Sequence, residues 1–291
     1  MMCHSGPFRW QVHSTAERIF LSRPPNSRAV TRQLTEDIHW LCECGPNRLE
    51  GSQTEVHVPQ HAYLLVGDEY TLLFDTLSPA ATETVLESLE TVLGNRPLDY
   101  LLPSHPDVPH AGNTGAIQTA YPDVELLAPR YGEGHGCYHL EAATRVGAGD
   151  TLDLGGLEVA FHPAPFPDAP IHCWMSERTT GTLFTVDFFG YPHFAPGECH
   201  AFAEDLDLEV SVARLTELHE FVLFWLKYAD SERTRRAIDR IITEHDPAIL
   251  APAHGNPIRE EPTAHLERMK EVVDRIALSA EEAHVHHGGE R

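Results

Sequence analysis

The sequence predicts an α/β protein built as one large domain. Short apolar runs typical of buried strands alternate with longer segments of helical periodicity. With 291 residues and 42% hydrophobic content, the chain is long enough to bury a large core. Glycine and proline are spread throughout, and no internal repeat or low-complexity linker divides the sequence. A single domain is therefore favoured over two.

The first predicted elements are a hairpin and a helix. In "VHVPQHAYLLVGDEYTLLFDTL" (56–77), two β-rich runs flank Gly67-Asp68, which is a turn signal. Segment 81–94 has apolar residues at three- and four-residue spacing and a terminal glycine, so it predicts a helix. The run "LDYLLPSH" (98–105) then gives a short buried strand that ends at His105.

The same alternation continues to the end of the chain. The further predictions are a strand at 124–130, a strand-turn-strand at 150–164, a strand within 181–190, helices at about 213–229 and 231–245, a strand within 248–255 and an amphipathic helix at 263–278. Residues 279–291 include "HVHHGGER" and are expected to form a disordered tail.

Charge and hydropathy exclude two classes of partner. The formal net charge is -23, and such an acidic surface repels the phosphates of nucleic acids. No run of about 18 apolar residues predicts a membrane span, and no signal-peptide core follows the N-terminus. We therefore expect a cytoplasmic protein with no membrane or nucleic-acid partner.

The six cysteines lack the paired spacing of a disulfide framework or a zinc ribbon. Cys42 and Cys44 stand close together in "CEC", at the end of a probable strand. We interpret this pair as structural and not as a metal or redox site.

Polar side chains with lone pairs gather where strands end. His105, Asp107 and His110 follow one strand, Asp187 follows another, and His254 follows a third. Loops at the carboxyl ends of strands commonly build the site of an α/β protein. The sequence therefore predicts that these side chains converge on a metal ion.

The phrases around these residues resemble the metallo-β-lactamase fold. They are "SHPDVPHAGN", "LFTVDFFG" and "ILAPAHG". In addition, "DIHWLCE", "HAYLLVGDEYTLLFDT", "FWLKYAD" and "APAHGNPI" resemble the diiron domain of flavodiiron proteins and the stand-alone oxygen-binding diiron proteins. The similarity covers about residues 35–275. It implies an αββα sandwich at 35–278, after an N-terminal extension at 1–34 and before a tail at 279–291.

The metal-ligand motif departs from that family at three positions. The family has His-x-Glu-x-Asp-His, whose first and last histidines are matched by His105 and His110. Asp107 replaces the glutamate, and Pro109 stands where the family has aspartate. Asp168 occupies the position of a family histidine, in "PFPDAPIHCW". His172, four residues later, is a possible additional ligand.

The resemblance implies a two-metal site. One metal would be bound by His105, Asp107 and Asp168 and the other by His110 and His254, with Asp187 bridging them. Two histidines and one carboxylate suit ferrous iron with open positions for a small ligand. Iron, one or two per chain, is therefore favoured, and zinc or manganese is possible.

The resemblance also implies a function. Flavodiiron proteins reduce dioxygen or nitric oxide with electrons from FMN in a flavodoxin-like domain, which needs about 140 residues. Because only residues 255–291 follow His254, we expect no internal FMN and a separate flavoprotein as electron donor. A homodimer is possible. An oxidoreductase of flavodiiron type is thus favoured over a metal-dependent hydrolase of an ester, thioester or lactone. The third alternative is a non-catalytic scaffold with a degenerate metal site.

Overall fold

Two β-sheets stacked face to face form the centre of the molecule. This computed structural model describes residues 30–48, 55–130, 143–169, 171–206 and 209–287. The seven-stranded sheet has the order β1 (Val30–Gln33), β2 (Ile38–Glu43), β5 (Gln60–Val66), β6 (Thr71–Phe74), β7 (Tyr100–Leu102), β8 (Glu125–Pro129) and β9 (Thr144–Val146). The five-stranded sheet has the order β10 (Thr151–Asp153), β11 (Glu158–Pro163), β12 (Cys173–Glu177), β13 (Thr182–Val186) and β14 (Ile249–Pro252). A separate ribbon pairs β3 (Pro46–Arg48) with β4 (Glu55–His57).

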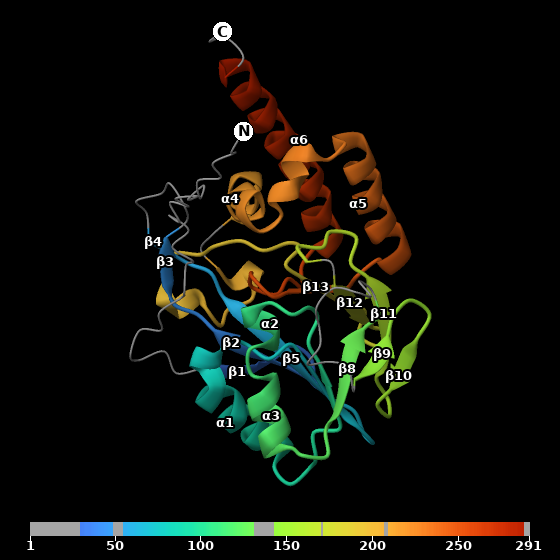
Figure 1. Cartoon of the computed structure of the whole chain (residues 1–291). Helices are drawn as coiled ribbons and strands as arrows, with labels where there is room; N and C mark the ends of the chain where they lie inside the picture. Colours follow the sequence, from blue (N-terminus) through green and yellow to red (C-terminus); the bar gives the residue numbers. More distant parts are fainter. Residues whose placement is uncertain (1–29, 49–54, 131–142, 170, 207–208, 288–291) are drawn as a thin grey trace, which may run out of the picture.

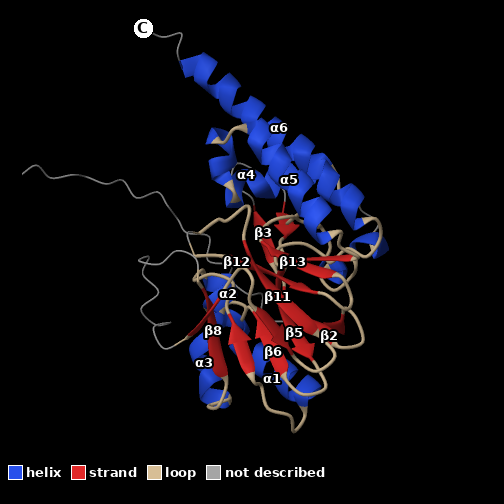
Figure 2. Ribbon diagram, turned by 90° about the vertical axis from the view of Figure 1, so that its right-hand side faces the viewer, coloured by secondary structure: helices blue, strands red, loops and turns tan. Residues whose placement is uncertain are grey.

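Helices cover the outer side of each sheet. Figures 1 and 2 show α1 (Thr82–Leu93) and α3 (Thr114–Ala120) on one side of the molecule. On the opposite side lie α4 (Val212–Val222), α5 (Ser231–His245) and α6 (Pro262–His287). The short elements are α2 (Val108–Ala111) and the 3-10 turns η1 (Pro79–Ala81), η3 (Pro196–Glu198), η4 (Ala203–Asp205) and η5 (Phe224–Tyr228). The layers follow the αββα order that the sequence predicts.

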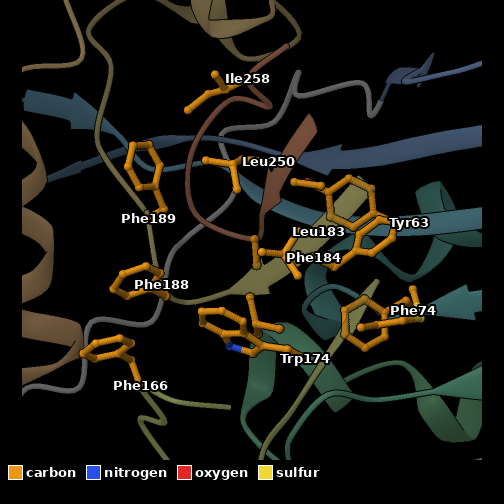
Figure 3. Close-up of a cluster of buried hydrophobic side chains, with 14 of the residues drawn as sticks. Tyr63, Phe74, Phe166, Trp174, Leu183, Phe184, Phe188, Phe189, Leu250 and Ile258 are labelled. Carbon is orange, nitrogen blue, oxygen red and sulfur yellow. The ribbon is translucent and has the colours of Figure 1, made fainter. Parts of the chain in front are cut away.

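Aromatic side chains fill the space between the sheets. Tyr63 and Phe74 of the first sheet meet Phe184 of the second edge to face, with ring centroids 5.0 and 5.8 Å apart (Figure 3). Phe188 stacks on Phe166 at 4.5 Å and extends this core toward the second layer of helices. Every residue of β13, "TLFTV", is buried, as expected of a strand that is covered on both faces.

The predicted elements are largely confirmed. The hairpin forms as β5 and β6, which are antiparallel, and the helix at 81–94 is α1, followed by Gly94 at φ 59°. The strand-turn-strand forms as β10 and β11. The strands expected to carry polar residues at their ends are β7, β13 and β14.

Three boundaries differ from the prediction. The helix expected at 213–229 ends at Val222 and is followed by η5. In η5, the indole N–H of Trp225 donates to the Pro167 carbonyl at 2.8 Å, which fixes this segment against the loop between β11 and β12. The helix α6 continues to His287 through "SAEEAH", a segment we expected to be disordered, because alanine and glutamate favour helix. The sheet begins with β1, before the predicted boundary at residue 35.

Candidate metal centre

Six histidine and aspartate side chains meet at one edge of the two sheets. His105 follows β7, and His110 lies on α2, which begins three residues later. Asp187 follows β13 directly, and His254 follows β14. Asp168 and His172 come from the loop between β11 and β12. These six side chains fall into two groups of possible metal ligands that share Asp187.

The two oxygens of Asp187 face different histidines. Oδ1 lies 3.2 Å from His110 Nε2 and 3.0 Å from His254 Nε2. Oδ2 lies 3.5 Å from His105 Nε2. The side chain of Asp187 is only 2% exposed. One buried carboxylate thus contacts histidines of both groups.

The first group joins His105, Asp168, His172 and Asp187. Asp168 Oδ1 lies 3.4 Å from His105 Nε2 and 3.1 Å from His172 Nδ1. Three buried atoms of the group make no hydrogen bond within the described residues: His105 Nε2, His172 Nε2 and Asp187 Oδ2. Buried polar atoms without a partner are costly, so their convergence fits a bound cation.

Hydrogen bonds to the far side of each imidazole set which nitrogen faces the centre. His110 Nδ1–H donates to the Asp75 carboxylate at 2.8 Å, and His254 Nδ1–H donates to the Pro59 carbonyl at 3.1 Å. His105 Nδ1 lies 3.1 Å from the Ser104 hydroxyl. In all three, Nε2 is left to point toward Asp187. Outer partners of this kind orient metal-ligating histidines and raise their basicity.

The electrostatics of the centre favour ionised carboxylates. Burial by itself would raise the pKa of Asp187, but the neighbouring His110 and His105 outweigh burial and hold the pKa well below its usual range. Burial also opposes ionisation of Asp168, yet the nearby His105 imidazole and the hydrogen bond with His172 lower its pKa to about 2. Burial disfavours charge on His110, but Asp75 and Asp187 raise its pKa well above the usual value. The carboxylates thus keep the negative charge that a cation requires.

Strained backbone holds the turn that carries Asp187. Val186 and Phe189 have φ of 54° and 74°, in the left-handed region that residues other than glycine rarely adopt. The turn is fixed by the Thr185 hydroxyl, which donates to the Phe188 carbonyl at 2.7 Å. His219 of α4 accepts the Phe189 N–H at 3.0 Å. Strain of this kind persists where the surrounding structure enforces a functional geometry.

The predicted ligands are distributed unequally. His105, His110, Asp168, Asp187 and His254 lie in the two groups, and so does His172, which we expected only as an additional ligand. Asp107 is in neither group. It is exposed and precedes α2, where its carbonyl accepts the N–H of His110 at 3.1 Å and that of Ala111 at 2.9 Å. The carboxylate we expected as a ligand thus lies outside both groups in this structure.

Sequence reasoning missed two features. Asp75 lies at the end of β6 and anchors both His110 and the backbone N–H of Ser104, the latter at 2.7 Å. Its position at a strand end, like that of Asp187, was the available signal. The second feature is another group of possible ligands, formed by Cys44, His57, His193 and Cys199. The "CEC" sequence pointed to Cys44, which we interpreted as structural.

The fold and centre define a class of protein. A profile of the metallo-beta-lactamase superfamily matches residues 57–210, and the chain belongs to this superfamily. Its sequence neighbours lie among flavodiiron proteins and related oxidases. The coenzyme F420H(2) oxidase of Methanothermobacter marburgensis is 24% identical over 250 residues, covering 78% of this chain and 58% of the oxidase. The chain spans about a quarter to three fifths of the length of the curated relatives it matches.

Solved structures share the fold. The rubredoxin oxygen:oxidoreductase of Desulfovibrio gigas has a TM-score of 0.68 at 21% identity, covering 87% of this chain and 62% of that one. A fragment of putative diflavin flavoprotein A 5 from Nostoc sp. PCC 7120 has a TM-score of 0.69 at 18% identity, covering 86% of this chain and 98% of the fragment. In the described part of this chain, no helix has the length and apolar character needed to cross a membrane.

Proposed function

We propose that the chain is a non-haem iron protein that binds or reduces dioxygen or nitric oxide at a modified two-metal centre. The observation that carries this proposal is the position of Asp187. Its two oxygens face separate groups of histidines at 3.0–3.5 Å, which is the arrangement expected of a ligand shared by two ions. The names of the sequence relatives, which include oxidases of coenzyme F420H(2) and a rubredoxin-oxygen oxidoreductase, support the same reaction class.

The two groups would hold their metals differently. His105, Asp168 and His172 would bind the first ion together with Asp187, and His110 and His254 would bind the second with the same carboxylate. The second group offers two histidines and one carboxylate, a set that suits ferrous iron and leaves coordination positions open. Pro109 contributes no ligand where the resembling family has aspartate, so the second group is the more open of the two.

The chain's own residues prepare the centre for iron. When bound, iron supplies the change of oxidation state that dioxygen or nitric oxide chemistry requires. The Asp75 carboxylate and the Pro59 carbonyl accept from Nδ1–H of His110 and His254, so Nε2 of each ring is the atom that would bind the metal, which would displace any proton from it. The buried position of Asp187 excludes bulk water from the shared ligand. Electrons would come from a separate flavoprotein in the cytoplasm, and a homodimer would bring a partner copy near the centre.

Metal stoichiometry tests the proposal. The protein would be produced with iron, purified anaerobically, and analysed by elemental mass spectrometry beside the Asp187→Ala variant. About two irons per chain, lost in that variant, would support the proposal, and one iron would assign the metal to His110, Asp187 and His254. Consumption of dioxygen or nitric oxide by the reduced protein would complete the test.

Two other results would replace the proposal. Zinc at the centre, together with turnover of an ester, thioester or lactone, would make the protein a metallo-hydrolase. A centre that takes up none of these metals would leave the scaffold alternative. In that case Asp187→Ala should not reduce the stability of the protein in the presence of metal.

A further inference from the structure

A second cluster of metal-binding side chains lies outside the Asp187 centre. Cys44 follows β2, His57 ends β4, His193 lies in the segment after β13, and Cys199 follows η3. One ligating atom of each lies within 4.8 Å of those of the other three. The two histidines and Cys199 are buried, and Cys44 is half-buried. We call these four residues the Cys2His2 cluster.

The distances within this cluster match the edges of a tetrahedron around zinc. Zinc binds sulfur at about 2.3 Å and nitrogen at about 2.0–2.1 Å, so tetrahedral angles place sulfur and nitrogen about 3.6 Å apart. Cys44 Sγ lies 3.6 Å from His57 Nδ1 and 3.4 Å from His193 Nε2. Cys199 Sγ lies 3.8 Å from His57 Nδ1. All three distances fall within a few tenths of an ångström of the expected edge.

Hydrogen bonds alone account for this cluster less well. His57 Nδ1 faces the sulfurs of Cys44 and Cys199 at once, but one imidazole nitrogen makes one such hydrogen bond. One cation at the centre of the four atoms would satisfy all of them together. Two cysteines and two histidines are a donor set that structural zinc sites use.

The backbone fixes the two histidines beside each other. His57 N–H donates to the His193 carbonyl at 2.7 Å, and His193 N–H donates to the His57 carbonyl at 2.9 Å. Their rings stack with centroids 5.2 Å apart. The Nδ1 atom of His193 lies 3.5 Å from the Glu198 carboxylate, on the side of the ring away from Cys44. This carboxylate has the place of an outer partner that orients a ligating histidine.

The Cys2His2 cluster adjoins the segments that support His254. His57 lies two residues before Pro59, whose carbonyl accepts from His254. The side-chain amide of Asn256 donates to the carbonyls of Glu198 and Ala201 at 2.7 and 2.8 Å, on both sides of Cys199. A metal at the cluster would therefore tie the loop after β13 to the ends of β2 and β4. The Asn256 hydrogen bonds already join the same loop to the segment that carries His254.

We propose that Cys44, His57, His193 and Cys199 form a structural zinc site that fixes the loop after β13 to the first sheet. Binding would release the two thiol protons to solvent and leave the oxidation state of both sulfurs unchanged. Because all four positions of the tetrahedron are filled by the protein, the site is closed and has a structural role.

Zinc content tests this site most directly when the Asp187 centre is disabled. The full chain carrying Asp187→Ala would be produced with added zinc and analysed by elemental mass spectrometry. We expect about one zinc per chain, lost when Cys44→Ser is added. Adding Cys42→Ser is the matched control, because Cys42 is also buried near Cys199 but lies outside the cluster, and zinc should be retained.

Cobalt(II) gives a second measurement that needs no substitution. Cobalt in the Cys2His2 cluster would show a sulfur-to-metal charge-transfer band and the visible bands of tetrahedral cobalt, whereas the ligand groups around Asp187 contain no sulfur among the described residues. A cobalt spectrum without the charge-transfer band would overturn the proposal even if the Cys44→Ser variant failed to fold. A disulfide between Cys44 and Cys199 in the purified protein, found by peptide mapping, would also overturn it.

Discussion

The Asp187 centre and the Cys2His2 cluster are built from different donor atoms and for different degrees of closure. The first uses nitrogen and oxygen, shares one carboxylate between two groups, and gives the second group only three ligands among the described residues. The Cys2His2 cluster offers two sulfurs and two nitrogens, which is the number of ligands that a closed tetrahedral zinc site takes. Open coordination allows a small ligand to bind, whereas closed coordination stabilises a fold. The chain thus combines a donor set suited to reaction with one suited to support.

The two regions are also held in place differently. The Asp187 turn is strained at Val186 and Phe189 and is restrained by one hydrogen bond within the turn and one to His219 of α4. In the Cys2His2 cluster, the two histidines sit on a pair of mutual backbone hydrogen bonds without a positive φ. We therefore expect the geometry of the Asp187 centre to depend on the residues around it. The Cys2His2 cluster, in contrast, is expected to stabilise the loops that it joins.

The largest expected effect on stability is the removal of metal from the Cys2His2 cluster. Zinc at about 1,000 times its dissociation constant stabilises the folded state by about 4 kcal/mol. A strong chelator should lower the free energy of unfolding by about this amount more in Asp187→Ala than in the double variant that also carries Cys44→Ser. Denaturant titration of both proteins, with and without chelator, measures the difference. If the chelator lowers the free energy of unfolding equally in the two proteins, the cluster has no structural role for a metal.

The next effect separates His172 from Asp107. His172 belongs to the first ligand group, so His172→Ala should weaken metal binding there by more than the roughly 10- to 100-fold expected for an outer partner. Asp107→Ala should leave the affinity unchanged, because Asp107 is exposed and outside both groups. Anaerobic titration with ferrous iron measures both. If Asp107→Ala also lost metal, the loop between His105 and His110 would have to rearrange on binding.

This pair of residues shows how far the sequence alone could lead. The strands and their polar ends were predictable, because buried strands are apolar runs and the residues that follow them are fixed to one edge of the sheet. Within the loop, His110 matched the family motif and Asp107 replaced its glutamate, and both were predicted to be ligands. The helix α2 starts at Val108 and buries His110, while Asp107 stays at the surface. The buried position of His110 depends on its hydrogen bond with Asp75, a residue that is distant in sequence.

The Cys2His2 cluster was harder to predict for a related reason. Its members come from four segments, and Cys44 and Cys199 have no short spacing that would mark a zinc motif. The contact between His57 and His193 is a single β-bridge outside the main sheets. Local patterns do not report such a bridge, because it follows from the packing of whole loops.

A smaller effect concerns the support of the Asp187 turn at acidic pH. His219 Nδ1–H donates to the Leu215 carbonyl at 2.6 Å, and Nε2 accepts from the Phe189 N–H. Protonation of the ring would keep the first hydrogen bond and remove the second, because Nε2 would become a donor. Burial, only partly offset by the Leu215 carbonyl, lowers the pKa of His219 to about 4. An unfolded histidine has a pKa of about 6.5, so the unfolded state binds more protons between these values and stability falls as pH decreases.

At pH 5 this group should cost about 2 kcal/mol of stability relative to pH 7. The variant His219→Gln, whose amide NH2 group can donate and whose oxygen can accept but which does not titrate, should lack this part of the pH dependence. Denaturant titrations of both chelated proteins at the two pH values measure the difference. If the two proteins lose the same stability on acidification, His219 is not the group that responds.

The smallest effect tests whether the Asp187 centre depends on its outer partners. Asp75 is 1% exposed, and its two oxygens accept from His110 Nδ1–H and from the Ser104 N–H. In Asp75→Asn, one of these donors would face an amide NH2 group, unless His110 changes tautomer and places its proton on Nε2, toward the metal. The φ of 65° at this position is one that asparagine tolerates, so the backbone should be preserved.

We therefore expect Asp75→Asn to weaken iron binding by about 10-fold, the lower end of the range for outer partners, because one hydrogen bond survives. Zinc bound at the Cys2His2 cluster should be unchanged, since Asp75 contacts none of its ligands in the described structure. Iron titration and zinc analysis of the same preparation compare the two sites directly. Loss of zinc as well would mean that the substitution disturbs the fold and not only the tautomer of His110. An unchanged affinity for iron would mean that His110 keeps Nε2 available without the carboxylate.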